Sequence, residues 1–120
     1  MPVWQQAMEI AVKVHSLTDL LPRKEDYGFT SQIRRSALSV SANIAEGFGR
    51  KHTLDKINFY LYARGSLTET QSHLEYGSKV GYIMHEDAVV VDLQLSAIHH
   101  DLNKLISGIT SRSTRNELKG

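Results

Sequence analysis

Apolar residues recur along this chain at intervals of three and four, the period of a helix that buries one face. The first such segment runs from Val3 to Leu21. Pro2 suits its first turn, because the missing N–H of proline would be unpaired there, and Pro22 is expected to end it. The second segment follows a loop over residues 22–28. Its apolar line is expected to continue to Phe48, with Gly47 and Gly49 as the stop.

The third segment is expected to run from an N-cap at Thr53 to about Val80, and it is apolar on three sides. A bundle helix needs only one buried stripe, so the additional apolar positions predict burial between subunits. The fourth segment carries an unbroken heptad pattern, which is typical of shallow-angle packing in a bundle. Its members are Met84, Ala88, Val91, Leu95, Ile98, Leu102, Leu105 and Ile109.

These four segments predict an all-α fold, an antiparallel up-down four-helix bundle formed by residues 1–109. No stretch alternates apolar and polar residues for long enough to predict a strand. Residues 110–120 are polar and are predicted to form a flexible C-terminal tail.

Length and composition agree with one domain of ordinary globular character. The chain has 120 residues, 41% hydrophobic and 22% charged, and no cysteine, which excludes disulfides and thiolate metal sites. The longest strongly apolar run, 88–91, is far too short to cross a bilayer, so no membrane association is expected. The N-terminus lacks the charged and apolar regions of a signal peptide, which favours a cytoplasmic location.

Catalytic and metal-binding patterns are missing from the sequence. It has no phosphate-binding glycine loop, dinucleotide fingerprint, nucleophile elbow or H-E-x-x-H motif. His99 and His100 are adjacent on a helix and point in different directions, and His73 with Glu69 is the spacing of an ordinary surface pair. We therefore expect no enzyme activity, no catalytic residue, no metal and no cofactor.

The formal net charge is only +1, but the charges are unevenly placed along the predicted bundle. The end that holds the link between the second and third helices and the C-terminal tail carries six basic residues against three acidic ones, with His52 besides. These are Arg50, Lys51, Lys56, Arg112, Arg115 and Lys119 against Glu46, Asp55 and Glu117. The opposite end carries Arg23, Lys24, Arg34, Arg35 and Lys79 against Asp19, Glu25, Asp26, Glu75, Glu86 and Asp87. The basic end could attract phosphates or be a solvated charge cluster without function.

One stretch carries a family signature. Residues 32–50 read QIRRSALSVSANIAEGFGR, preceded by Tyr27-Gly28-Phe29 and followed at 64–67 by Arg-Gly-Ser-Leu. The chain thereby resembles the four-helix proteins encoded in intervening sequences of bacterial 23S ribosomal RNA genes, a family that also includes the accessory variability protein of diversity-generating retroelements. The resemblance implies an up-down four-helix bundle, a homo-oligomeric ring (pentameric in relatives), an association with RNA or DNA and, for the retroelement branch, a reverse transcriptase partner.

Six polar residues of this stretch share one face of the second helix, opposite its apolar line. They are Gln32, Arg35, Ser39, Asn43, Glu46 and Arg50. Two interpretations remain open: a solvated face with a Glu46–Arg50 ion pair, or a polar contact between subunits.

Two functions from different classes follow. The first is an oligomeric protein that binds nucleic acid electrostatically through Arg50, Lys51 and Lys56, with Arg34 and Arg35 as a competing site at the other end. No aromatic stacking surface is expected there, since Phe48 is the only aromatic residue close by in sequence and belongs to the core line. The second is a structural or adaptor ring that recruits a protein partner such as a reverse transcriptase, with nucleic acid incidental.

Overall fold

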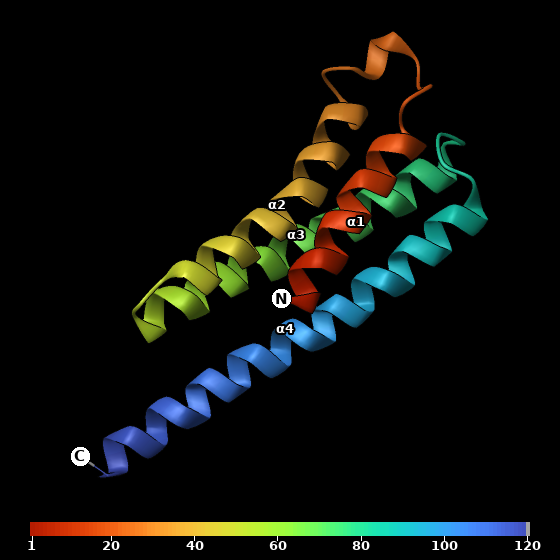
Figure 1. Ribbon diagram of the computed structural model, residues 1–120. Coiled ribbons are helices and arrows are strands. Elements are labelled where there is room, and N and C mark those ends of the chain that lie inside the picture. The colour runs from red at the N-terminus through yellow and green to blue at the C-terminus, as the bar shows by residue number, and fades with distance from the viewer. Residues whose placement is uncertain (120) are drawn as a thin grey trace.

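Four long helices form the molecule. The computed structural model describes the backbone of residues 1–119 and the side chains of residues 1–112. The elements are α1 (Pro2–Leu17), the short 3-10 helix η1 (Arg23–Glu25), α2 (Phe29–Gly49), α3 (Thr53–Lys79) and α4 (His85–Lys119). Successive helices run in opposite directions, and α1 and α3 each pack against both α2 and α4 (Figure 1). The predicted all-α, up-down four-helix bundle is confirmed, and residues 1–119 contain no strand.

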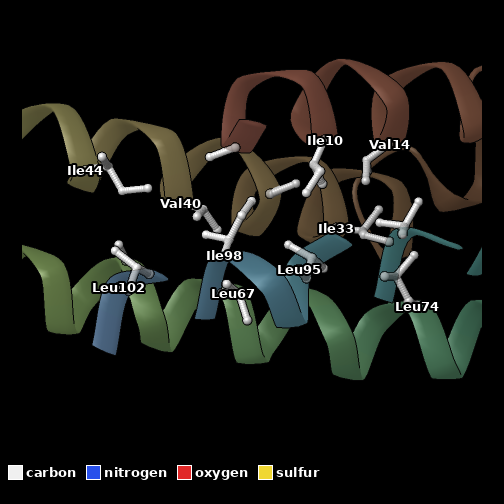
Figure 2. Close-up of a cluster of buried hydrophobic side chains, with 14 of the residues drawn as sticks. Ile10, Val14, Ile33, Val40, Ile44, Leu67, Leu74, Leu95, Ile98 and Leu102 are labelled. Atoms are coloured by element: carbon white, nitrogen blue, oxygen red, sulfur yellow. The ribbon is translucent and has the colours of Figure 1, made fainter. Parts of the chain in front are cut away.

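The core lies where the apolar stripes of the four helices meet. In Figure 2 the labelled side chains point inward from all four helices and fill the space between them. Burial of each Leu or Ile side chain contributes about 1.5–3 kcal/mol relative to exposure, so this stripe dominates the stability of the bundle. The most deeply buried large residues are Val14, Ile33, Val40, Ile44, Leu67, Leu74, Val91, Leu95, Ile98 and Leu102.

Helix α1 ends at Leu17 and not at Leu21, the residue before Pro22, so the predicted end was four residues too late. At this end the buried Thr18 hydroxyl donates to the carbonyl oxygen of Val14 (2.8 Å), and Arg34 donates to the carbonyl oxygen of His15 (3.1 Å). Side chains therefore bond carbonyl groups of the last turn, which lack partners within the helix. The segment between Thr18 and Pro22 then forms a turn in which Leu20 is exposed.

Helix α4 begins at His85, so Met84 precedes the helix and is exposed instead of packing in the seam. At its other end α4 continues to Lys119 and includes most of the segment predicted as a polar tail. Gly120 and the side chains of residues 113–120 lie outside the described part of the chain. The flexibility expected of residues 110–120 therefore stays a prediction.

The four helices have unequal lengths, which gives the bundle two different halves. Helix α1 has 16 residues, against 21 in α2 and 27 in α3. It covers only the half of the bundle near η1, and its N-terminus lies midway along α4 (Figure 1). The other half, which holds the link between α2 and α3, is built from α2, α3 and α4 alone.

The corner where α2 begins is closed by a cluster of aromatic side chains. Glu25 accepts a hydrogen bond from the backbone N–H of Phe29 (3.2 Å) and another from the Tyr82 hydroxyl (3.1 Å). Burial, with the Glu25 carboxylate beside the phenol, raises the pKa of Tyr82 above its ordinary value of 10.0. The Phe29 ring packs against Tyr82 and reaches the backbone of Gly77, where an added Cβ would lie only 2.7 Å from it.

A row of polar pairs joins α3 to α4 on the outside of the bundle. Arg64 donates to Asn103 (2.8 Å), Gln71 donates to Ser96 (3.2 Å), and the Ser78 hydroxyl lies 3.3 Å from His85. The three positions on α3 are seven residues apart, two helical turns, so the pairs recur along one edge of the helix.

No described helix combines the length and the continuous apolar character that crossing a membrane requires.

Candidate nucleic-acid interface

The predicted basic residues Arg50, Lys51 and Lys56 surround the sharp link between α2 and α3. Helix α2 ends at Gly49 and α3 begins at Thr53, with His52 and not the expected Thr53 at the N-cap position. The link can be this tight because Gly47 has no side chain: a Cβ there would lie 2.7 Å from the Tyr60 ring. Tyr60 is almost fully buried beneath Gly47, and this burial raises the pKa of its hydroxyl.

Lys56 holds the end of α2. Its ammonium nitrogen donates to the carbonyl oxygens of Gly47 (3.1 Å) and Phe48 (2.8 Å). These carbonyls belong to the last turn of the helix, where a positive charge is favourable, and that of Gly47 also accepts a hydrogen bond from the backbone N–H of Arg50 (3.3 Å). Lys56 therefore has a structural role at this end, in addition to the phosphate contact predicted for it.

Arg50 is held between an acidic and an aromatic neighbour. Its guanidinium donates to Glu46 (3.2 Å), which confirms the i,i+4 pair expected from the sequence. The guanidinium carbon also lies 4.7 Å from the centre of the Phe59 ring, a cation–π contact across the link. Phe59 in turn meets Tyr62 edge-on, with ring centres 5.8 Å apart.

Phe48 is not in the core, contrary to the prediction from its apolar line. Its side chain is 63% exposed, and the Lys56 ammonium lies 5.7 Å from its ring centre. Ile44, one turn earlier on the same apolar line, is fully buried, so the line leaves the core in the last turn of α2. The expectation that no aromatic surface accompanies the basic residues was therefore wrong.

The competing arginine pair at the other end divides into two different environments. Arg34 donates from Nε to the Thr18 hydroxyl (2.8 Å) and from Nη2 to the carbonyl oxygen of His15 (3.1 Å), with Asp19 3.7 Å away. It thus ties the end of α1 to α2. Arg35 is exposed on the other side of α2. The structure does not bring Arg34 and Arg35 together with the basic residues of the link.

The polar stripe on α2 lies on one outward face, as the helical period requires. Gln32, Arg35, Glu46 and Arg50 are exposed, whereas Ser39 and Asn43 are half-buried. The Asn43 side chain donates back to the carbonyl oxygen of Ser39 (2.9 Å), a contact within the helix. A role of this face between subunits stays a prediction.

The other cations predicted for the basic end lie on α4. Arg112 is exposed, and the C-terminal end of α4 extends beyond the bundle on the same side as the α2–α3 link (Figure 1). The side chains of Arg115, Glu117 and Lys119 are outside the described part of the chain. His73, the candidate surface partner of Glu69, lies 3.6 Å from it.

Sequence reasoning missed Phe59 and Tyr62. Phe59 is nine residues from Arg50 in sequence, and the two meet only because the chain reverses tightly at the link. The available signal was the short spacing between Gly49 and Thr53, which requires the first turns of α3 to face the last turns of α2.

Comparisons with known proteins agree with the sequence resemblance. The family model described as 23S rRNA-intervening sequence protein matches residues 1–104. A crystal structure from Bacteroides thetaiotaomicron VPI-5482, of a protein with unknown function from the S23 ribosomal protein family, superposes with a TM-score of 0.80 at 28% sequence identity. The alignment covers 87% of this chain and 97% of that one. No curated protein matches the chain. The suggested relation to the accessory variability protein of retroelements stays a prediction.

Proposed function

Because the chain belongs to the family of 23S rRNA-intervening sequence proteins, we propose that it is a non-enzymatic, oligomeric four-helix bundle that associates with RNA or DNA through basic surface patches. The observation that carries this proposal is the placement of Arg50, Lys51 and Lys56 around one short link, with Arg112 at the same end of the molecule. Lys51 is exposed and takes part in no ion pair among the described residues, so its charge is available to a phosphate.

Oligomerisation would multiply this basic end by the number of subunits and strengthen its field. Large exposed apolar side chains at the α3–α4 connection and in the first turns of α4 support a second copy as the partner. They are Val80, Met84, Val89, Val90 and Leu93. Val89 and Leu93 also border a groove of about 590 Å³ between α3 and α4. A homo-oligomeric ring, pentameric as the family resemblance suggests, would cover this surface.

Binding is measured by fluorescence anisotropy of a labelled RNA or DNA oligonucleotide as salt is varied. The combined change Lys51→Ala and Arg112→Ala removes two exposed cations from the basic end without touching the contacts of Arg50 and Lys56. It should weaken binding and reduce the slope of log affinity against log salt by about 1.4, because each phosphate contact to a single strand contributes about 0.7. The matched control is Arg23→Ala with Lys24→Ala, which removes the same charge from exposed positions of η1 at the opposite end.

An equal loss of binding in the control would show that binding is not centred on the basic end. If no oligonucleotide binds even at low salt, the alternative takes over: a structural or adaptor ring that recruits a protein partner such as a reverse transcriptase. The exposed apolar surface around the α3–α4 connection would then be the candidate contact for that partner.

Assembly is tested by light scattering after size exclusion. Leu93→Glu places a charge in the exposed apolar surface and should lower the molecular mass of the assembly. Leu20→Glu places the same charge at a 98% exposed leucine in the turn after α1 and should leave the mass unchanged. A wild-type mass that stays at 13.5 kDa at high concentration would contradict the oligomeric part of the proposal.

A further inference from the structure

Aromatic rings lie beside the α2–α3 link in two groups. In the first, Phe48 presents a ring that is 63% exposed, with the Lys56 ammonium 5.7 Å from its centre. Lys56 is itself fixed by the last carbonyl groups of α2, so the charge stays beside the ring. An exposed phenylalanine next to a fixed cation is a surface with one flat apolar element and one phosphate-binding element.

In the second group, Arg50 lies over the ring of Phe59, and Tyr62 meets that ring edge-on. The guanidinium of Arg50 covers Phe59 at 4.7 Å, and its orientation is set by Glu46 at 3.2 Å. Tyr62 meets the edge of Phe59 and is 58% exposed. A guanidinium plane and an aromatic face are the two kinds of surface on which proteins stack unpaired bases.

From these two groups of residues we infer that the corner at the α2–α3 link binds single-stranded nucleic acid by stacking unpaired bases on its rings. This link corner consists of Phe48, Arg50, Lys51, Lys56, Phe59 and Tyr62. The inference rests on the proposed function and specifies its substrate class. Phosphates contact Lys51 and the remaining N–H groups of Arg50, while bases contact Phe48, the Arg50 plane and Tyr62. Duplex RNA or DNA keeps its base faces inside the helix and can use only the cations.

The charges around the corner fit this division. Glu46 is occupied by Arg50, and Asp55 lies in the first turn of α3, where the helix dipole favours a carboxylate. Neither carboxylate opposes an uncharged base placed on the rings. The combination of flat rings with neighbouring cations therefore favours an unpaired nucleic-acid strand as the occupant.

The test compares three probes of equal length: an unstructured oligonucleotide of about 12 nucleotides, the corresponding abasic strand and the duplex. The intact strand and the abasic strand have the same phosphates and differ only in their bases. The intact strand should bind at least about fivefold more tightly than the abasic one, since one stacked base is worth about 1 kcal/mol or more. Phe48→Ala and Tyr62→Ala should each weaken binding of the intact strand by about fivefold and leave the abasic strand unaffected.

Two control variants are matched to these changes. Tyr27→Ala removes a 98% exposed aromatic ring at the opposite end of the bundle, and Leu54→Ala removes a 69% exposed apolar side chain beside the corner that has no ring. Neither should change the affinity for any probe. Circular dichroism and light scattering of all four variants establish that fold and assembly are retained.

Each result decides between specific possibilities. If the abasic and intact strands bind equally and the ring variants have no effect, while Lys51→Ala with Arg112→Ala still weakens binding, the stacking inference is wrong and the electrostatic function stands. If no probe binds, the proposed function fails, and the inference fails with it. If Phe48→Ala or Tyr62→Ala lowers the mass of the assembly, the rings belong to a contact between subunits, and the inference is overturned.

Discussion

The two glycines of α3 allow a direct test of the packing, because the same substitution should have opposite effects at Gly65 and Gly77. Both lie within α3, and neither has a positive φ. At Gly65 an added Cβ meets nothing within 4 Å. Alanine there removes only the entropic penalty of glycine in a helix, so Gly65→Ala should stabilise the protein by about 0.5–1 kcal/mol.

At Gly77 an added Cβ would lie 2.7 Å from the Phe29 ring and 3.1 Å from Ile83. The Phe29 ring cannot move aside easily, because it is buried and packed against Tyr76 and Tyr82. Overpacking of this kind costs about 1–3 kcal/mol, and the gain in helix propensity offsets at most about 1 kcal/mol of it. Gly77→Ala should therefore destabilise the protein by about 0.5–2 kcal/mol.

Thermal unfolding followed by circular dichroism at one fixed protein concentration measures both effects, since self-association would make the midpoint depend on concentration. A change of 1 kcal/mol corresponds to about 4 °C for a chain of this length. The midpoint should rise by about 2–4 °C for Gly65→Ala and fall by about 2–8 °C for Gly77→Ala. A Gly77→Ala protein at least as stable as the wild type would refute the reasoning, because it would mean that α3 does not approach Phe29 as closely as described.

Three further outcomes are expected. Arg34→Ala should lower the free energy of unfolding by about 1–2 kcal/mol, because its bonds to His15 and Thr18 are lost. Arg35→Ala, at an exposed neighbouring position, should change the free energy of unfolding by less than about 0.5 kcal/mol. Equal effects of the two changes in urea titrations would contradict the role given to Arg34. Thr70→Val should lower the free energy of unfolding by about 1–2 kcal/mol in the same assay, because the buried Thr70 hydroxyl lies 2.8 Å from both Ser36 Oγ and the carbonyl oxygen of Ser66. An unchanged urea midpoint would mean that these two contacts contribute nothing to stability. Burial and Glu25 raise the pKa of Tyr82 in the folded state, so its contribution to stability is fully present below pH 10 and is lost as pH rises through the folded-state pKa. The decline of stability above pH 10 should therefore be smaller in Tyr82→Phe than in the wild type.

Much of the bundle could be predicted because helical period and core burial depend on the same residues. The lines through Ile33 and Leu95 identified which faces meet, and both residues are fully buried. Helix ends were less predictable where side-chain contacts decide them. Helix α1 ends at Leu17, well before Pro22, at a place where Thr18 and Arg34 bond to carbonyl groups of its last turn.

The candidate site was predictable in its charges but not in its surface. Arg50, Lys51 and Lys56 are close in sequence, so the link brings them together in any antiparallel hairpin of helices. The apolar line continues in period through Phe48, so the line alone does not show that burial ends after Ile44. The contact between Arg50 and Phe59 depends on how closely α2 approaches α3 at Gly47, which the local sequence pattern alone does not specify.

The polar pairs between α3 and α4 have a consequence for how this protein can change in length. Arg64, Gln71 and Ser78 stand at whole multiples of two helical turns, so inserting one residue between Arg64 and Ser78 would rotate part of the row away from α4 by about 100°. Inserting seven residues would rotate it by only about 20° but shift it by about 10 Å along the axis, so the pairs re-form only if α4 gains seven residues at the same level. Length variants of this helical hairpin that keep the polar pairs should therefore differ by complete heptads in both α3 and α4.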